Sequence, residues 1–195
     1  MMETIEISGV LGMIAAVVLT LNICMGILMS TNYRKLPIWK KIPQKYQILK
    51  MVDLHEYTSY AVLVIVFLHI IILPLDPASG FRYSSILWPA TNQHQPIFVW
   101  LGYSSLIALL LVIITSQNPI RKALGFSLWK NIHIISYLTS VLFIVHAIVM
   151  DPLLKDRSVD FIDAEKIFME LCGVILLFAF YWRYRFKRKS NELGK

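Results

Sequence analysis

The chain of 195 residues is too apolar for an ordinary water-soluble domain. Apolar residues make up 57% of it, charged residues only 16%, and its mean hydropathy is +0.62. A soluble globular domain carries about 25% charged residues. The composition therefore excludes most soluble enzyme classes and indicates an integral membrane protein.

The net charge of +7 does not indicate a nucleic-acid partner, because the basic residues cluster between apolar blocks instead of forming one patch. Both cysteines, Cys24 and Cys172, fall inside apolar blocks and neither belongs to a CxxC motif. A zinc or iron–sulfur site built on cysteine is therefore not expected.

Five blocks have the length and apolar composition of membrane-spanning helices, for which about 20 residues are needed. They cover about residues 7–29, 57–75, 97–115, 132–150 and 167–182. We therefore predict an all-α bundle of five transmembrane helices that forms a single domain over residues 1–195, with lipid as its surroundings.

The connections between these blocks predict the orientation of the chain. Most of the 19 basic residues lie in residues 33–50, in residues 121–130 and in the C-terminal tail. The alternate connections hold most of the acidic residues. Because cytoplasmic loops carry the excess of Lys and Arg, we predict an external N-terminus and a cytoplasmic C-terminus.

Four of the five histidines lie in, or at the ends of, two of the predicted helices. His55 and His69 are 14 residues apart on the second, and His133 and His146 are 13 apart on the fourth. Each separation is about 20 Å along a helix, most of a hydrocarbon core about 30 Å thick. Both helices run outward, so His55 is level with His133 and His69 with His146.

Two levels of paired histidines favour two b-type haems. A pair of imidazoles fills both axial positions of a haem iron, which then transfers electrons and does not bind oxygen. On an ideal helix the 13-residue spacing leaves His133 and His146 about 140° apart. A bend, or ligation from two flanks of the helix, must absorb this angle.

Two other hypotheses remain open at this point. Membrane histidines also occur in haem-free metal-ion or proton transporters, although usually in clusters with acidic residues. Alternatively, each histidine forms only a hydrogen bond to a neighbouring helix. Haem absorbance separates these hypotheses from the cytochrome.

The histidine spacings, and the residues between the third and fourth blocks, resemble the ferric reductase-like transmembrane family, whose members include ferric reductases, NADPH oxidases and bacterial methionine sulfoxide reductase haem subunits. The resemblance covers roughly residues 49–146. It implies that His55 and His133 bind an inner haem, that His69 and His146 bind an outer haem, and that electrons flow outward. The residues that carry it are Thr115, Ser116, Arg121, Lys122, Leu124, Gly125, Trp129, His133 and Tyr137.

The chain departs from the larger members of that family, because no flavin or nicotinamide domain follows the last helix and no Gly-rich nucleotide loop is present. We therefore expect the haem subunit of an oxidoreductase in a prokaryotic plasma membrane. Its donor would be a flavin at the cytoplasmic face, a separate flavoprotein, an iron–sulfur protein or quinol. Its external acceptor would be ferric iron, oxygen or a periplasmic redox protein.

Several further residues are secondary candidates. Haem propionates need cationic partners, for which Arg82 outside and Arg121 inside, with Lys122 and Lys130, are the candidates. His94 is an exposed loop histidine or an acceptor site, and Glu170 is a proton relay or a helix-to-helix hydrogen bond. The glycines of the first and third helices would allow a helix or a porphyrin to approach closely; they are Gly9, Gly12, Gly26 and Gly102.

Overall fold

The computed structural model describes residues 4–31, 34, 37–41, 43, 50–88, 95–150, 162 and 164–193. Within these ranges all regular structure is helical. The elements in chain order are α1 (Thr4–Ser30), α2 (Pro37–Lys40), α4 (Met51–Ile72), the 3₁₀ turns η2 (Leu73–Leu75) and η3 (Pro77–Ser79), α5 (Tyr83–Leu87), α6 (Pro96–Ser116), α7 (Asn118–His133), α8 (Ile135–Val149) and α9 (Ala164–Leu193).

Five of these helical segments are long and apolar enough to cross a membrane, as predicted. They are Thr4–Ser30, Met51–Leu75, Pro96–Ser116, Asn118–Val149 and Lys166–Lys189. The chain is therefore a multi-pass, all-α membrane protein. Helices suit this setting because they satisfy their own backbone hydrogen bonds where no water is available.

The fourth predicted helix differs most from the structure. It was expected as one helix over residues 132–150, but α7 begins at Asn118 and the helix is interrupted at Ile134 before α8. Within α7, Gly125 has a φ of 73°, a conformation that glycine adopts at little cost. Ile134, which lies between His133 and His146, keeps helical backbone angles (φ −64°, ψ −21°), so the kink of this span lies at Gly125, before both histidines.

The last helix also extends beyond its predicted end at Trp182, because α9 continues to Leu193. Its extra turns contain Arg and Lys, which are good helix formers. An ion pair one turn apart, between Arg188 Nε and Glu192 Oε1 at 2.9 Å, adds to them. Trp182, the predicted end of the last helix, therefore lies within a longer helix.

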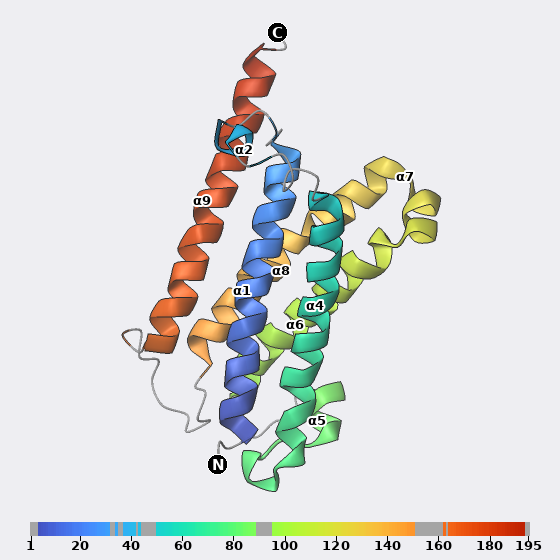
Figure 1. The fold of residues 1–195 in the computed structure, drawn as a ribbon. Coiled ribbons are helices and arrows are strands. Elements are labelled where there is room, and N and C mark those ends of the chain that lie inside the picture. Colours follow the sequence, from blue (N-terminus) through green and yellow to red (C-terminus); the bar gives the residue numbers. More distant parts are fainter. Residues whose placement is uncertain are drawn as a thin grey trace.

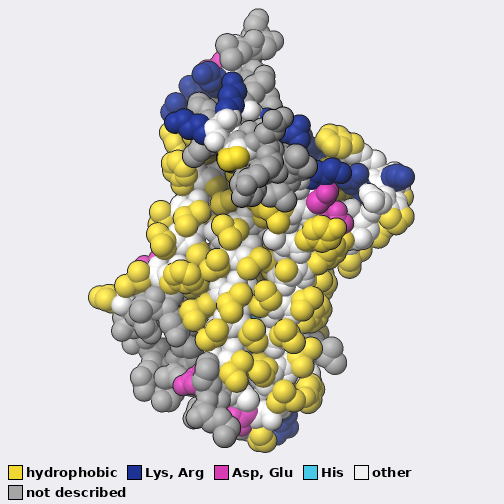
Figure 2. All heavy atoms as spheres, in the orientation of Figure 1, with side chains coloured by type: hydrophobic (Ala, Val, Ile, Leu, Met, Phe, Trp, Pro, Cys, Tyr) yellow, Lys and Arg dark blue, Asp and Glu magenta, His cyan; other side chains and the backbone are white. Residues whose placement is uncertain are grey.

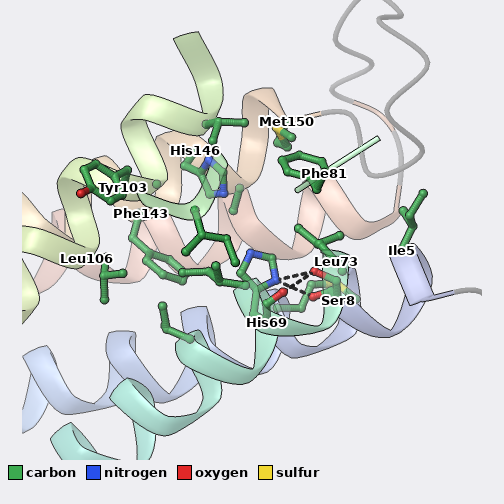
Figure 3. Close-up of a pocket in the computed structure, with 18 of the residues that line it drawn as sticks. Ile5, Ser8, His69, Leu73, Phe81, Tyr103, Leu106, Phe143, His146 and Met150 are labelled. Atoms are coloured by element: carbon green, nitrogen blue, oxygen red, sulfur yellow. Dashed lines mark hydrogen bonds between the residues drawn. The ribbon is translucent and has the colours of Figure 1, made fainter. Parts of the chain in front are cut away.

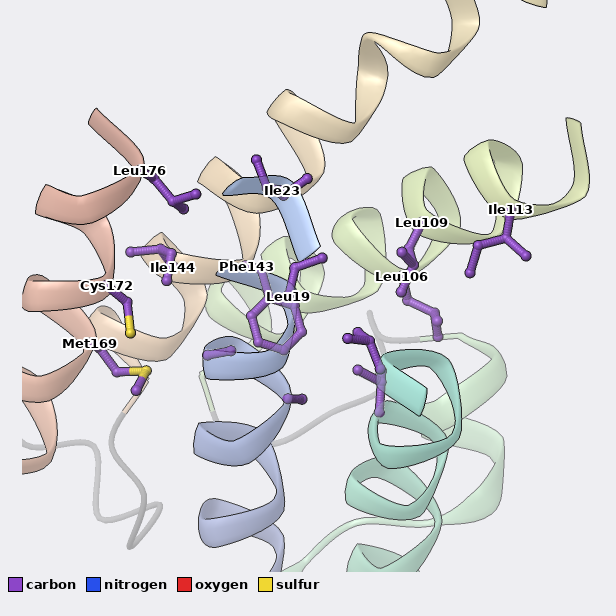
Figure 4. Packing of buried hydrophobic residues seen from close by; sticks show 14 of the residues in the cluster. Leu19, Ile23, Leu106, Leu109, Ile113, Phe143, Ile144, Met169, Cys172 and Leu176 are labelled. Atoms are coloured by element: carbon purple, nitrogen blue, oxygen red, sulfur yellow. The ribbon is translucent and has the colours of Figure 1, made fainter. Parts of the chain in front are cut away.

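Helix α1 lies at the centre of the bundle, with α4 packed along one side and α9 along another (Figure 1). Helix α8 packs mainly on α6. The core between these helices contains Leu19 and Ile23 from α1 and Phe143 from α8 (Figure 4). Ala15 and Ala16 are completely buried, and such small residues let membrane helices approach closely.

The surface has an apolar flank and one basic end. Figure 2 shows Lys and Arg side chains gathered near the C-terminal half of α9, α2 and α7, with hydrophobic side chains covering the flank below them. The N-terminus and α5 lie at the opposite end (Figure 1). This distribution is the one on which the predicted orientation rests.

The predicted orientation can be tested by labelling single cysteines with a membrane-impermeant maleimide. Tyr83→Cys on α5, where the native side chain is exposed, should react in intact cells. Glu192→Cys, at the exposed end of α9, should react only after lysis. The wild-type chain, whose Cys24 and Cys172 are half-buried and buried, is the control; the reverse labelling pattern would show an inverted chain.

Candidate functional site

The inner pair, His55 on α4 and His133 at the end of α7, lies together in the structure. The centroids of the two imidazole rings are 6.2 Å apart, and the ring planes make an angle of 64°. A metal–imidazole bond is about 2 Å long, so two imidazoles on opposite faces of one iron have centroids about 6 Å apart. The separation therefore fits a metal held between them.

The outer pair, His69 on α4 and His146 on α8, lines one cavity of about 340 Å³. Figure 3 shows both rings directed into it, with Phe143 and Leu106 nearby. The volume is within the range of about 300–1,000 Å³ for ligand-binding sites, which are mostly apolar with a few polar groups. An apolar cavity that contains two imidazoles suits a flat hydrophobic macrocycle with a central metal.

Three of the four histidines direct Nδ1 at a backbone carbonyl oxygen of a neighbouring helix. His55 Nδ1 lies 3.0 Å from the Asn22 carbonyl, His69 Nδ1 2.7 Å from that of Ser8, and His146 Nδ1 2.8 Å from that of Phe98. Because a carbonyl can only accept, Nδ1 must carry the proton in each ring. Nε2 is then unprotonated and available as a metal ligand.

A glycine stands four residues after each of these carbonyls. The carbonyls belong to residues 8, 22 and 98, and the glycines are Gly12, Gly26 and Gly102. In a helix the side chain at i+4 covers the surface over residue i. A Cβ on Gly102 would lie 2.9 Å from His146 Cε1, and one on Gly12 3.2 Å from His69 Cε1. The glycines thus make room for imidazoles.

Helix α1 holds α4 at both histidine levels by the same reciprocal contact. The Ser8 hydroxyl donates to the His69 carbonyl at 2.8 Å, and the Asn22 amide donates to the His55 carbonyl at 2.6 Å. Each α1 residue therefore accepts from the imidazole with its backbone and donates to the same histidine with its side chain. Ser8 and Asn22 are 14 residues apart, as are His55 and His69.

His133 is held differently from the other three histidines. Its Nδ1 lies 3.2 Å from the Ser116 hydroxyl at the end of α6, and that hydroxyl also accepts from Trp129 Nε1 at 3.3 Å. The Trp129 ring packs on the His133 ring with centroids 5.0 Å apart. Ser116, Trp129 and His133, which carried part of the sequence resemblance, therefore form one contact group.

The structure places both arginines that were predicted as propionate partners at the surface. Arg82 is exposed just before α5 and does not line the outer cavity, although its neighbour Phe81 does. Arg121 is also exposed, and its guanidinium lies 5.4 Å from the centre of the Trp129 ring. That these arginines bind haem propionates therefore stays a prediction.

Two basic residues that the sequence did not single out make contacts near the histidine pairs. Lys166, near the start of α9, is only 6% exposed and lines the outer cavity. Arg183, also on α9, donates to the hydroxyl of Tyr137, one turn after His133. The sequence did offer one indication of Lys166, because it is a basic residue on the side of the membrane where acidic residues predominate.

The other secondary candidates lie away from the pairs or outside the described residues. Glu170 is half-buried on α9 and does not line the outer cavity. Gly9 lines that cavity, and a Cβ there would meet nothing within 4 Å. His94 lies outside the described residues.

The two histidine pairs fit a bound group that already supplies most of the ligands of its metal. Among the described residues, no group of three or more His, Cys, Asp or Glu side chains could hold a bare metal ion. Each pair supplies two nitrogen ligands, which is the number that a haem requires because the porphyrin supplies the other four. His55, His133, His69 and His146 are therefore suited to hold two haems.

Comparison with known proteins agrees with this geometry. Residues 11–145 match the family described as "Ferric reductase like transmembrane component". The chain is also 31% identical over 97 residues to the protein-methionine-sulfoxide reductase heme-binding subunit MsrQ of Herminiimonas arsenicoxydans, an alignment that covers 50% of this chain and 42% of that relative. No solved structure matches the chain.

Alanine substitutions at the glycines should loosen haem at one level each. Gly102→Ala and Gly12→Ala should weaken outer-level binding, Gly102→Ala more because its added Cβ would be closer to the imidazole. Gly26→Ala should act on the inner level, where His55 Cε1 is 3.3 Å from the added Cβ. Displaced metal-site partners cost about 10- to 100-fold in affinity, which haem titration of the purified variants would measure.

The matched control is Gly173→Ala on α9, where the added methyl would meet only Ile144 at an ordinary 3.4 Å. It should bind haem like the wild type. Equal haem affinity in Gly102→Ala and Gly173→Ala would show that the close approach of the imidazole has no role in ligand binding.

Proposed function

The chain belongs to the ferric reductase like transmembrane component family, and we propose that it is a b-type dihaem cytochrome that carries electrons across a membrane. His55 and His133 hold the inner haem, and His69 and His146 hold the outer haem. A bound haem supplies one-electron exchange between ferric and ferrous iron. The protein contributes the ligands, their spacing and an apolar setting.

The observation that best supports this proposal is that hydrogen bonds fix the proton of three of the four histidines on Nδ1. Three Nδ1 atoms are held by carbonyl oxygens, so each of these imidazoles has an unprotonated Nε2. A histidine that only joins two helices needs one hydrogen bond. It does not need a second imidazole facing its other ring nitrogen. Here each histidine also faces a second histidine, at two levels of the bundle.

The two levels explain why one chain would hold two haems. Fourteen residues separate His55 from His69 on α4, which is about 20 Å along a helix. The hydrocarbon core is about 30 Å thick, so a single haem at either level would leave most of it uncrossed. Two haems divide the distance into shorter steps.

The donor and the acceptor are separate molecules in this proposal. The basic end carries the inner pair, so a flavin, a flavoprotein or quinol on the cytoplasmic side is the donor, and ferric iron or a periplasmic redox protein is the acceptor. MsrQ is described as a heme-binding subunit of a reductase. By analogy we propose that this chain is the membrane subunit of an oxidoreductase in a bacterial plasma membrane.

A haem-free transporter of metal ions or protons is the alternative, and the geometry favours it less. Its ion would need several ligands at one point, whereas each described level offers two imidazoles and no acidic cluster. Glu170, the acid within the last span, does not line the outer cavity.

A reduced-minus-oxidised optical spectrum, with haem counted per chain, tests the proposal. The wild type should show about two low-spin haems per chain, as expected for bis-histidine ligation. His69→Ala and His146→Ala should each retain about one haem, the inner one, and His55→Ala and His133→Ala should retain the outer one.

The fifth histidine offers a matched control, since His94→Ala should leave both haems in place. A wild-type chain without haem, after expression with ample haem supply, would contradict the cytochrome proposal and favour the transporter. One haem in the wild type that is lost in all four histidine variants would contradict the two-level arrangement.

A further inference from the structure

Helix α9 supplies no histidine, but it brings one basic side chain to each histidine level. Lys166 and Arg183 are 17 residues apart on it, which is about 25 Å along a helix. This is close to the separation of the two histidine levels. Each residue contacts α8, or its C-terminal end, about one turn after a histidine. The same kind of contact therefore recurs at the two ends of the bundle.

At the outer level, Lys166 reaches into the cavity that His69 and His146 line. Its ammonium group donates to the carbonyls of Ile148 and Met150, at the C-terminal end of α8. Met150 is four residues after His146. A cation at a helix C-terminus is favoured by the free carbonyls and by the helix dipole, which explains how a charged side chain is held in an apolar site.

At the inner level, Arg183 is half-buried between α1 and α8. Its guanidinium donates to the Tyr137 hydroxyl and, at 3.0 Å, to the Ser30 hydroxyl, and it lies 5.1 Å from the centre of the Tyr137 ring. Tyr137 is four residues after His133. Arg183 is thereby fixed near the inner pair, while Arg185, two residues further along the same helix, is exposed.

We propose that Lys166 and Arg183 are the electrostatic partners of the outer and the inner haem, each binding the carboxylate side of its haem and raising its reduction potential. This inference rests on the proposed dihaem function. Reduction removes one positive charge from the iron, so a fixed cation nearby stabilises the ferrous state. Water and salt screen a charge less when it is buried or partly buried, so the buried Lys166 and the half-buried Arg183 act more strongly than exposed cations.

The exposed arginines provide the contrast within the same chain. Arg121 and Arg185 are solvent-facing, and each lies over an aromatic ring, that of Trp129 and that of Tyr181 respectively. They carry the same charge as Arg183 and lie at the same end of the bundle. If only net charge at the basic end mattered, all three would affect the inner haem equally.

The test is a potentiometric redox titration of purified full-length protein, with each midpoint assigned from the single-haem His69→Ala and His55→Ala variants. Lys166→Gln, which keeps hydrogen-bond donors but removes the charge, should lower the midpoint of the outer haem only. Arg183→Gln should lower that of the inner haem only, and Arg183→Lys should restore most of that shift. Arg121→Gln and Arg185→Gln should change neither midpoint by a comparable amount.

Unchanged midpoints in both Gln variants at full haem occupancy would overturn the inference, as would a shift of the opposite haem. If the Lys166 variants do not accumulate, the Arg183 series decides by itself, because Arg183→Lys controls for folding. A wild type without haem would instead overturn the proposed function. Two haems in the wild type, with midpoints that do not change in the Lys166 and Arg183 variants, would be consistent with the proposed function and would contradict only this inference.

Discussion

The structure depends on how an imidazole is held where no water is available. In hydrocarbon, the Nδ1 proton needs an acceptor from the protein, and only then is Nε2 reliably free to bind a metal. Helix carbonyls supply that acceptor for His55, His69 and His146. A carbonyl inside a helix is normally covered by the side chain one turn later, so the absence of a side chain at Gly12, Gly26 and Gly102 is what exposes these three.

To meet this requirement, different helices supply the histidines, the hydrogen-bond acceptors and the cations. Helices α4, α7 and α8 carry the histidines, α1 and α6 supply the acceptors, and α9 carries the buried Lys166 and the half-buried Arg183. Because α4 packs mainly on α1, and α7 and α8 pack mainly on α6, each histidine helix lies against the helix that fixes its imidazoles. The two helix pairs then face each other with the histidines between them. A displacement of α1 would therefore disturb the imidazoles of His55 and His69 together.

At the inner level, His133 departs from this rule, with a chemical consequence. A backbone carbonyl has a fixed position, whereas the Ser116 hydroxyl that holds His133 can rotate and is shared with the Trp129 N–H. The basicity of a ligand imidazole follows the strength of its outer hydrogen bond. In the proposed dihaem arrangement, His133 is thus the histidine whose ligand strength depends on side chains, and these side chains lie at the basic end of the bundle.

The sequence by itself determined the five apolar spans and the spacing of the four histidines, because hydropathy and helical rise are local properties that need no knowledge of packing. It also predicted that a bend, or ligation from two flanks of the helix, must absorb the 13-residue spacing of His133 and His146, and this stays a prediction because Ile134 keeps helical backbone angles. The tertiary structure alone decided the partners of the imidazoles. Gly12 and Gly26 could not be assigned to His69 and His55 until α1 was placed against α4. The contacts of Lys166 and Arg183 with α8 also needed the tertiary structure, because a sequence shows which side of the membrane a charge lies on, but not which helix its side chain contacts.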